Sequence, residues 1–181
     1  MVAIANACRS GELNANISLV ISNRPDAAGL QTAQELGLNT AAIDHTSFAS
    51  RPEFDNALHE QLSAVQPDWI VLAGFMRILT DDFVNRWAGK IINIHPSLLP
   101  LYPGLDTHAR AIAAGDTQAG ASVHIVTPEL DAGPVLAQVK VPIQSGDTPQ
   151  TLAERVLQEE HALYVEALKQ CVGAELTAKK E

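Results

Sequence analysis

The sequence predicts an α/β fold with a doubly wound, mostly parallel, Rossmann-like sheet, an antiparallel edge pair and a long carboxyl-terminal helix. Along most of the chain, strand-like apolar runs alternate with segments of helical periodicity. Near the end, the runs ASVHIVT and PVLAQVKVPI are joined by only a few residues. Such a connection is too short for a helical crossover, so it predicts an antiparallel pair. We expect residues 1–181 to form a single domain.

The first half of the chain begins with a helix. The opening residues, MVAIANACRSG, have apolar positions at helical spacing and end in a glycine suited to a C-cap. A later helix is predicted from Ser50, because Pro52 and Glu53 complete a capping box at its start. Between these two helices we expect a strand in ISLVISN, a helix in AAGLQTAQELG and a strand in NTAAI.

The second half continues the alternation. The run DWIVLAGF is apolar on both faces, as a buried parallel strand requires. It is followed by a helix in DDFVNRWAGK, a strand in KIINI, a helix in THARAIAAG and the antiparallel pair. Pro149 suits the first turn of a final helix that runs to about Cys171, and residues 172–181 are expected to be a flexible tail.

Composition narrows the classes of partner. The formal net charge is -9 and aromatic residues make up 4% of the chain, which argues against nucleic acids and anionic membrane surfaces. No apolar run approaches the length of a membrane span, and the two cysteines lie far apart in sequence. We therefore expect a cytoplasmic protein with small-molecule partners.

Candidate functional residues gather at the end of the strand KIINIH. Side chains alternate along a strand, so Asn93 and His95 share one face, and Pro96 places them at its carboxyl end, where doubly wound sheets bind ligands. The alternative is that the pair only fixes the following loop. Asp131, between the two late strands, is either a turn former or a carboxylate that meets His95, favours the protonated imidazole and makes it an acid.

Glu160 interrupts the apolar face of the last helix. A buried carboxylate is costly, so Glu160 has either a protein partner or a place in a site that needs negative charge. The sequence contains no serine-hydrolase, phosphate-loop or dinucleotide motif, and its histidines show no metal-ligand spacing. No metal is therefore expected.

Three segments together identify a family resemblance. LAGFMRIL, NIHPSLLPLYPGLDTHARAI and SVHIVTPELDAGPV resemble, in order, the phosphoribosylglycinamide formyltransferase family of the formyltransferase superfamily, over about residues 1–164. The resemblance implies transfer of a formyl group from 10-formyltetrahydrofolate to the amine of glycinamide ribonucleotide in purine biosynthesis. The substrate amine is itself the nucleophile, which agrees with the lack of a serine motif.

The resemblance also implies roles for individual residues. Asn93 and His95 would donate to the developing formyl oxyanion, while Asp131 would keep His95 charged and help relay the proton. Arg51 and Glu160 match contacts to the ribonucleotide, the latter to its ammonium group. The positions that match the folate site are Met76, Arg77, Ile78, Leu79, Thr127, Pro128, Glu129 and Leu130.

One departure from the family concerns the amino terminus. Members begin with a strand and a Gly-Ser-Asn loop that holds the substrate phosphate, whereas Met1 falls here at the start of the following helix. We therefore expect a chain shortened at its amino terminus, as a monomer or homodimer, that binds the ribonucleotide poorly. Two alternatives to transfer are a non-catalytic folate-binding protein and an enzyme that hydrolyses formyltetrahydrofolate.

Overall fold

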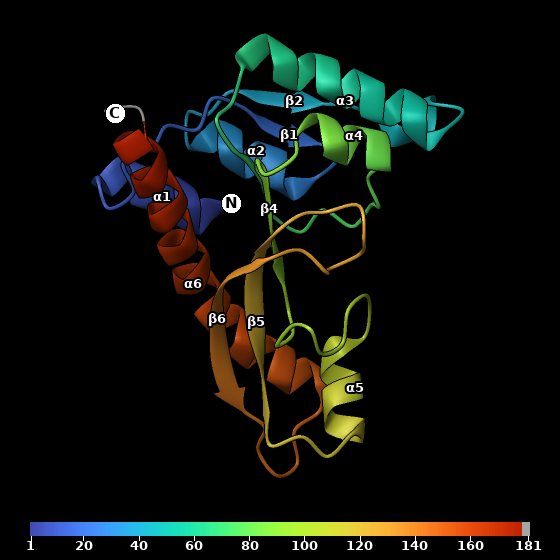
Figure 1. Ribbon diagram of the computed structural model, residues 1–181, viewed down its shortest axis with the longest axis vertical. Helices are drawn as coiled ribbons and strands as arrows, with labels where there is room; N and C mark the ends of the chain where they lie inside the picture. Colours follow the sequence, from blue (N-terminus) through green and yellow to red (C-terminus); the bar gives the residue numbers. More distant parts are fainter. Residues whose placement is uncertain (179–181) are drawn as a thin grey trace.

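The computed structural model describes residues 1–178, with side chains to residue 173, and its helices and strands follow the predicted order (Figure 1). One short 3-10 helix, η1, was not predicted. The elements are α1 (Val2–Ser10), β1 (Val20–Ser22), α2 (Ala28–Glu35), β2 (Thr40–Ala42), η1 (His45–Ser47), α3 (Arg51–Val65), β3 (Ile70–Leu72), α4 (Asp81–Arg86), β4 (Ile91–His95), α5 (Thr107–Ala113), β5 (Gln118–Ile125), β6 (Val135–Pro142) and α6 (Pro149–Ala178).

The strands form two sheets. β1 and β2 make a parallel pair, and a second sheet has the order β3-β4-β5-β6. β3 and β4 are parallel, and the predicted antiparallel pair β5–β6 is confirmed. β5 also runs antiparallel to β4, so it lies inside the sheet and only β6 is at the edge. The mixed α/β architecture is therefore as predicted, with more antiparallel pairing than the sequence indicated.

Several strands are shorter than the apolar runs that predicted them. β1 and β3 each have three residues, within runs of seven and eight apolar-rich residues. The flanking residues pack instead into the core without ladder partners: Ile17 and Trp69 lie against one hydrophobic cluster, and Phe75 against another. Hydrophobic burial thus extends further along the chain than strand pairing.

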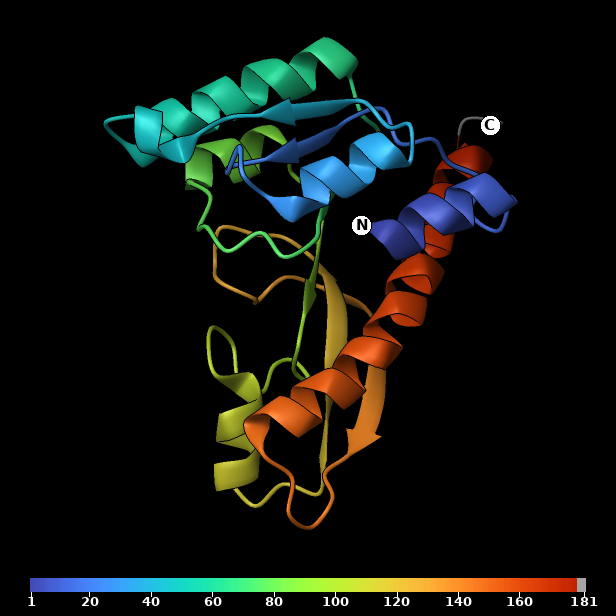
Figure 2. The same cartoon turned by 180° about the vertical axis from the view of Figure 1, so that it is seen from behind.

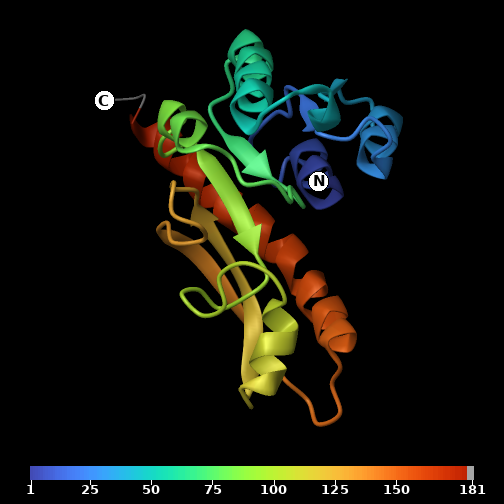
Figure 3. The same cartoon turned by 90° about the vertical axis from the view of Figure 1, so that its right-hand side faces the viewer.

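Helices cover both faces of the structure, as a doubly wound fold requires. Seen from behind, α2 and α3 lie on opposite sides of β1 and β2 (Figure 2). The long helix α6 runs along one side of the second sheet and packs on β5 and β6 (Figure 3). The hydroxyl of Tyr164 on α6 lies 2.7 Å from the carbonyl of Leu72 and 3.0 Å from that of Ile92, which ties the helix to β3 and β4.

The start of α3 and the end of α6 can be compared with their predicted positions. Ser50 Oγ accepts a hydrogen bond from the Glu53 amide, as the predicted capping box requires, whereas the Glu53 carboxylate accepts one from Ala49, the residue before the N-cap, instead of from Ser50. α6 continues to Ala178, past the predicted end near Cys171. The predicted flexible tail remains untested, and residues 179–181 lie outside the described part of the chain. None of the helices within residues 1–178 has both the length and the apolar character of a bilayer span.

Candidate active site

β4 brings two predicted site residues to the centre of the second sheet. Its antiparallel pairing with β5 places Asn93 opposite His124 and His95 opposite Ser122. The face that Asn93 and His95 were predicted to share is therefore completed by residues of β5. A polar cluster arises inside the sheet because the ladder register sets these side chains next to one another.

Both ring nitrogens of His95 face an acceptor. Nε2 lies 2.9 Å from the Tyr102 carbonyl, and because a carbonyl only accepts, Nε2 carries a proton in this contact. Nδ1 lies 3.4 Å from Asp131 Oδ2. The imidazole is buried and its ring is fixed from two sides, so its orientation is set before any ligand arrives.

Asp131 reaches this cluster from the β5–β6 connection. Its backbone is left-handed, with φ 50°, and its side chain is only 9% exposed. Oδ2 accepts a hydrogen bond of 2.9 Å from the Gly104 amide, and Oδ1 lies 3.7 Å from His124 Nε2. The carboxylate therefore joins three chain segments: the loop after β4, strand β4 itself and strand β5. The prediction that Asp131 meets His95 agrees with this geometry, and Asp131 is more than a turn former.

His124 is the member of the cluster that the sequence did not reveal. It is 2% exposed, and Nδ1 lies 3.0 Å from the Ile125 carbonyl, which requires a proton on Nδ1. In the neutral ring Nε2 then accepts from the Asn93 amide at 3.3 Å. Burial is the main cause that lowers the pKa of His124, and the neighbouring His95 adds to it, while the hydrogen bond to Ile125 and the Asp131 carboxylate act in the opposite direction. A neutral His124 thus orients the Asn93 side chain.

Ser122 holds the loop that follows His95. Its buried hydroxyl donates to the Ser97 carbonyl at 2.6 Å and accepts from the Leu99 amide at 3.0 Å. The Gln138 amide donates to the same hydroxyl at 2.7 Å and to the Leu99 carbonyl at 2.8 Å. This network connects the Pro-rich loop to β5 and β6 next to the site.

Ser122→Ala is expected to destabilise the fold by about 1–3 kcal/mol, because it leaves the buried Leu99 amide without an acceptor. Urea unfolding monitored by circular dichroism measures the change. Ser63→Ala, at an exposed serine of α3, is the matched control and should have little effect. Equal stability of the two variants would contradict the role assigned to Ser122.

The segments expected to bind folate lie in two loops. After β3, Met76 is 78% and Ile78 58% exposed, whereas Leu79 packs into a core cluster beside Phe75. In the β5–β6 connection, Leu130 is exposed and the Thr127 hydroxyl donates to the Glu129 carbonyl. Both loops contact the same cluster, since Val126 also packs against it. Exposed apolar side chains thus lie on two loops that are both anchored to the same hydrophobic cluster. The remaining predicted positions in these loops are Arg77 and Pro128.

The two positions predicted to bind the ribonucleotide differ in burial. Glu160 is half-buried, and burial raises the pKa of its carboxyl. Within the described part of the chain it makes no hydrogen bond or ion pair with another side chain, and its role as a ribonucleotide contact stays a prediction. Arg51 is an exposed residue in the first turn of α3. Within residues 1–178 it makes no hydrogen bond or ion pair with the polar cluster around His95.

Glu160→Gln is expected to raise the melting temperature at pH 7–8 by roughly 1–2 °C, the effect being small because solvent screens a half-exposed carboxylate. A carboxyl pKa raised in the folded state contributes stability below its ordinary value of 4.5, and this contribution is lost as pH rises through the raised value. The variant avoids that loss, so the melting temperatures of the two proteins should become equal near pH 4. Melting curves from pH 4 to 8 test this, and a gain that is independent of pH would contradict it.

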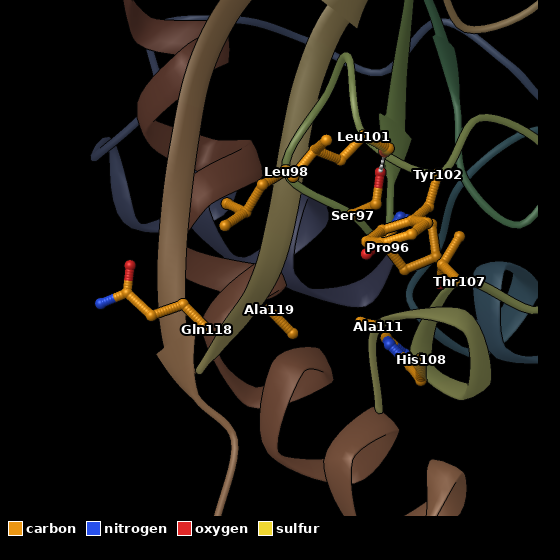
Figure 4. Close-up of a pocket in the computed structure, with 10 residues that line it drawn as sticks. All are labelled: Pro96, Ser97, Leu98, Leu101, Tyr102, Thr107, His108, Ala111, Gln118 and Ala119. Atoms are coloured by element: carbon orange, nitrogen blue, oxygen red, sulfur yellow. Dashed lines mark hydrogen bonds between the residues drawn. The ribbon is translucent and has the colours of Figure 1, made fainter. Parts of the chain in front are cut away.

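Two pockets in the described part of the chain lie outside the polar cluster around His95. A pocket under the loop after β4 holds only about 10 Å³ and is lined partly by Pro96, Ser97 and His108 (Figure 4). That is space for about one water molecule and not for a folate or nucleotide. An open groove of about 490 Å³ over α2 and β2 contains none of the predicted site residues. Within the described residues, no three His, Cys, Asp or Glu side chains gather closely enough to hold a metal ion.

Comparison with known proteins gives the family. The profile of a family described as formyl transferase matches residues 1–168. The chain is 46% identical over 162 residues to the phosphoribosylglycinamide formyltransferase of Escherichia coli K12, with 90% of this chain and 76% of that enzyme covered. This chain belongs to the formyl transferase family.

Other members of the family agree in sequence and structure. The phosphoribosylglycinamide formyltransferase structure from Coxiella burnetii has a TM-score of 0.87 at 47% identity, covering 93% of this chain and 79% of that one. The trifunctional purine biosynthetic protein adenosine-3 of Gallus gallus is 44% identical over 167 residues, which are 92% of this formyl transferase but 17% of that longer protein. The resemblance read from three motifs is therefore confirmed along most of the chain.

Proposed function

We propose that this formyl transferase moves the formyl group of 10-formyltetrahydrofolate to the amine of glycinamide ribonucleotide. The observation that carries the proposal is the buried cluster of Asn93, His95, His124 and Asp131 in a chain of this family. The names of the similar relatives support the choice of substrate. The proposal includes a cytoplasmic location, a monomer or homodimer, and no metal.

The chemistry requires stabilisation of one oxyanion. The substrate amine attacks the formyl carbon, a new C–N bond forms, and the carbonyl electron pair moves onto oxygen. Collapse of this intermediate restores the carbonyl and breaks the bond to the folate nitrogen, which takes up a proton as the attacking nitrogen loses one. Asn93 Nδ2 and His95 Nε2 are the donors that would hold the oxygen at its charged stage.

The other two members of the cluster orient these donors. Asp131 lies beside His95 Nδ1 and fixes the direction of the ring, so that Nε2 can donate and the ring can pass a proton onward. Neutral His124 accepts one Asn93 N–H, which leaves the second N–H for the substrate. Each donor therefore has a partner that fixes its direction.

The two substrates would contact different parts of the chain. The exposed Met76 and Ile78 on one loop and Leu130 on the other offer apolar contact to a flat pterin ring, while the backbone of these loops offers hydrogen bonds. Glu160, a half-buried carboxylate that has no hydrogen bond or ion pair within the described residues, would attract the ammonium form of the amine. Arg51 remains a proposed contact for the ribonucleotide.

The test is a direct assay of the protein with both substrates. Formylated ribonucleotide and tetrahydrofolate should appear together in equal amounts. Formate released without amine would show a hydrolase instead. Folate binding measured by calorimetry, with no turnover, would show a non-catalytic binding protein.

A further inference from the structure

Asp55 is a buried carboxylate outside the cluster described above. It lies on α3, is 4% exposed, and is followed three residues later by the core residue Leu58. An ionised carboxylate rarely lies so deep without a partner. Its Oδ2 accepts a hydrogen bond of 2.7 Å from the backbone amide of Thr80.

Thr80 directly follows residues 76–79, the loop that was predicted to bind folate. It is also the N-cap of α4, where its hydroxyl accepts from the Phe83 amide at 3.3 Å. One residue before Asp55, the ring of Phe54 lies beneath Arg77, with the guanidinium carbon 5.1 Å from the ring centroid. Two consecutive residues of α3 therefore fasten this loop at Arg77 and at Thr80, and the exposed Ile78 lies between them.

We propose that Asp55 is a positioning residue for the folate: it fixes the loop of residues 76–79 through the Thr80 amide. The inference rests on the proposed function, because it assigns the loop to the folate. A loop held in its binding conformation loses less entropy when a ligand orders it, so the anchor increases affinity without touching the ligand. A carboxylate suits this task because a hydrogen bond to a charged acceptor is stronger than one to a neutral acceptor.

The first pair of variants removes the acceptor or keeps it. Asp55→Ala should weaken binding of tetrahydrofolate, the folate product, about tenfold, which is the order expected for loss of one charge-assisted bond. Asp55→Asn keeps an oxygen acceptor and should recover most of the affinity. Asn56→Ala is the control: that side chain is on the same helix, is exposed, and accepts from Arg86 on α4 instead of the loop.

The second pair acts on the donor and remains informative if Asp55→Ala does not fold. Thr80 has φ -72°, which proline can adopt, so Thr80→Pro removes the amide proton and places the ring Cδ where that proton met Asp55 Oδ2, which breaks the anchor from the loop side. Thr80→Ala loses the same hydroxyl cap but keeps the amide. Thr80→Pro should bind tetrahydrofolate about tenfold more weakly than Thr80→Ala.

Calorimetry with tetrahydrofolate, steady-state kinetics and amide hydrogen exchange are the measurements. A positioning role raises the KM for formylfolate, leaves kcat and the amine KM nearly unchanged, and speeds exchange across residues 76–80. Unchanged tetrahydrofolate affinity in Asp55→Ala, or in Thr80→Pro relative to Thr80→Ala, would overturn the inference. So would equal loss of affinity for both substrates. Failure of the wild-type protein to bind tetrahydrofolate would instead overturn the proposed function.

Discussion

His95→Ala is expected to lower kcat for formyl transfer by about 10³-fold or more, because it removes the proposed oxyanion donor and proton carrier of the cluster. The affinity for tetrahydrofolate should stay within about threefold of wild type, since in the proposed reaction the ring would contact the formyl group and not the pterin. The buried ring also contacts Asp131 and the Tyr102 carbonyl, so a moderate loss of stability will accompany the change.

Single-turnover assays at saturating substrates, together with calorimetry, separate these effects. His59→Ala is the matched control, because His59 lies on α3 with its ring against Trp87, outside the cluster. It should leave kcat within about twofold of wild type. Full kcat in His95→Ala, at wild-type folding, would exclude the role given to His95.

Gly133→Ala should have the second largest effect, although Gly133 carries no functional group. A Cβ at this position would overlap the Ile125 carbonyl oxygen and press on the Thr127 methyl group. Because the overlapping atom belongs to the backbone of β5, the β5–β6 connection must move, and Asp131 lies in that connection. We expect a loss of about 1–3 kcal/mol in the free energy of unfolding from overpacking, and a decrease in kcat of about 10²-fold or more as Asp131 leaves His95.

Gly29→Ala is the matched control for this substitution. Gly29 lies in α2, and a Cβ there meets nothing within 4 Å, so alanine should stabilise the protein by about 0.5–1 kcal/mol and leave kcat unchanged. Urea unfolding and initial rates measure both changes. If Gly133→Ala kept wild-type stability and rate, the connection would not need a glycine and the geometry proposed for Asp131 would be wrong.

The parts of the site that depend on local sequence could be predicted. The alternation along β4 and the break at Pro96 are properties of neighbouring residues, so Asn93 and His95 could be placed on one face at the end of a strand. The short β5–β6 connection likewise limits where Asp131 can lie. These inferences need only the geometry of a single strand or turn.

His124 could not be found in this way, because its role depends on register. The long segment between β4 and β5, with α5 inside it, allows many alignments of the two strands, and only one sets His124 opposite Asn93. Asp55 did leave a signal: it lies three residues before Leu58 and seven before Leu62, on the apolar face of α3. Glu160 was found from the same kind of signal.

The hydrogen bond between His95 Nε2 and the Tyr102 carbonyl has a consequence for how the rate could be enhanced. A formyl oxygen that approaches this nitrogen competes with a backbone oxygen of similar strength, so exchanging one acceptor for the other gains little while the substrate is intact. Once negative charge develops, the oxyanion is the stronger acceptor and displaces the carbonyl. The hydrogen bond to Tyr102 would thus keep His95 Nε2 from stabilising the bound substrate. The full interaction energy of this donor would appear only in the transition state.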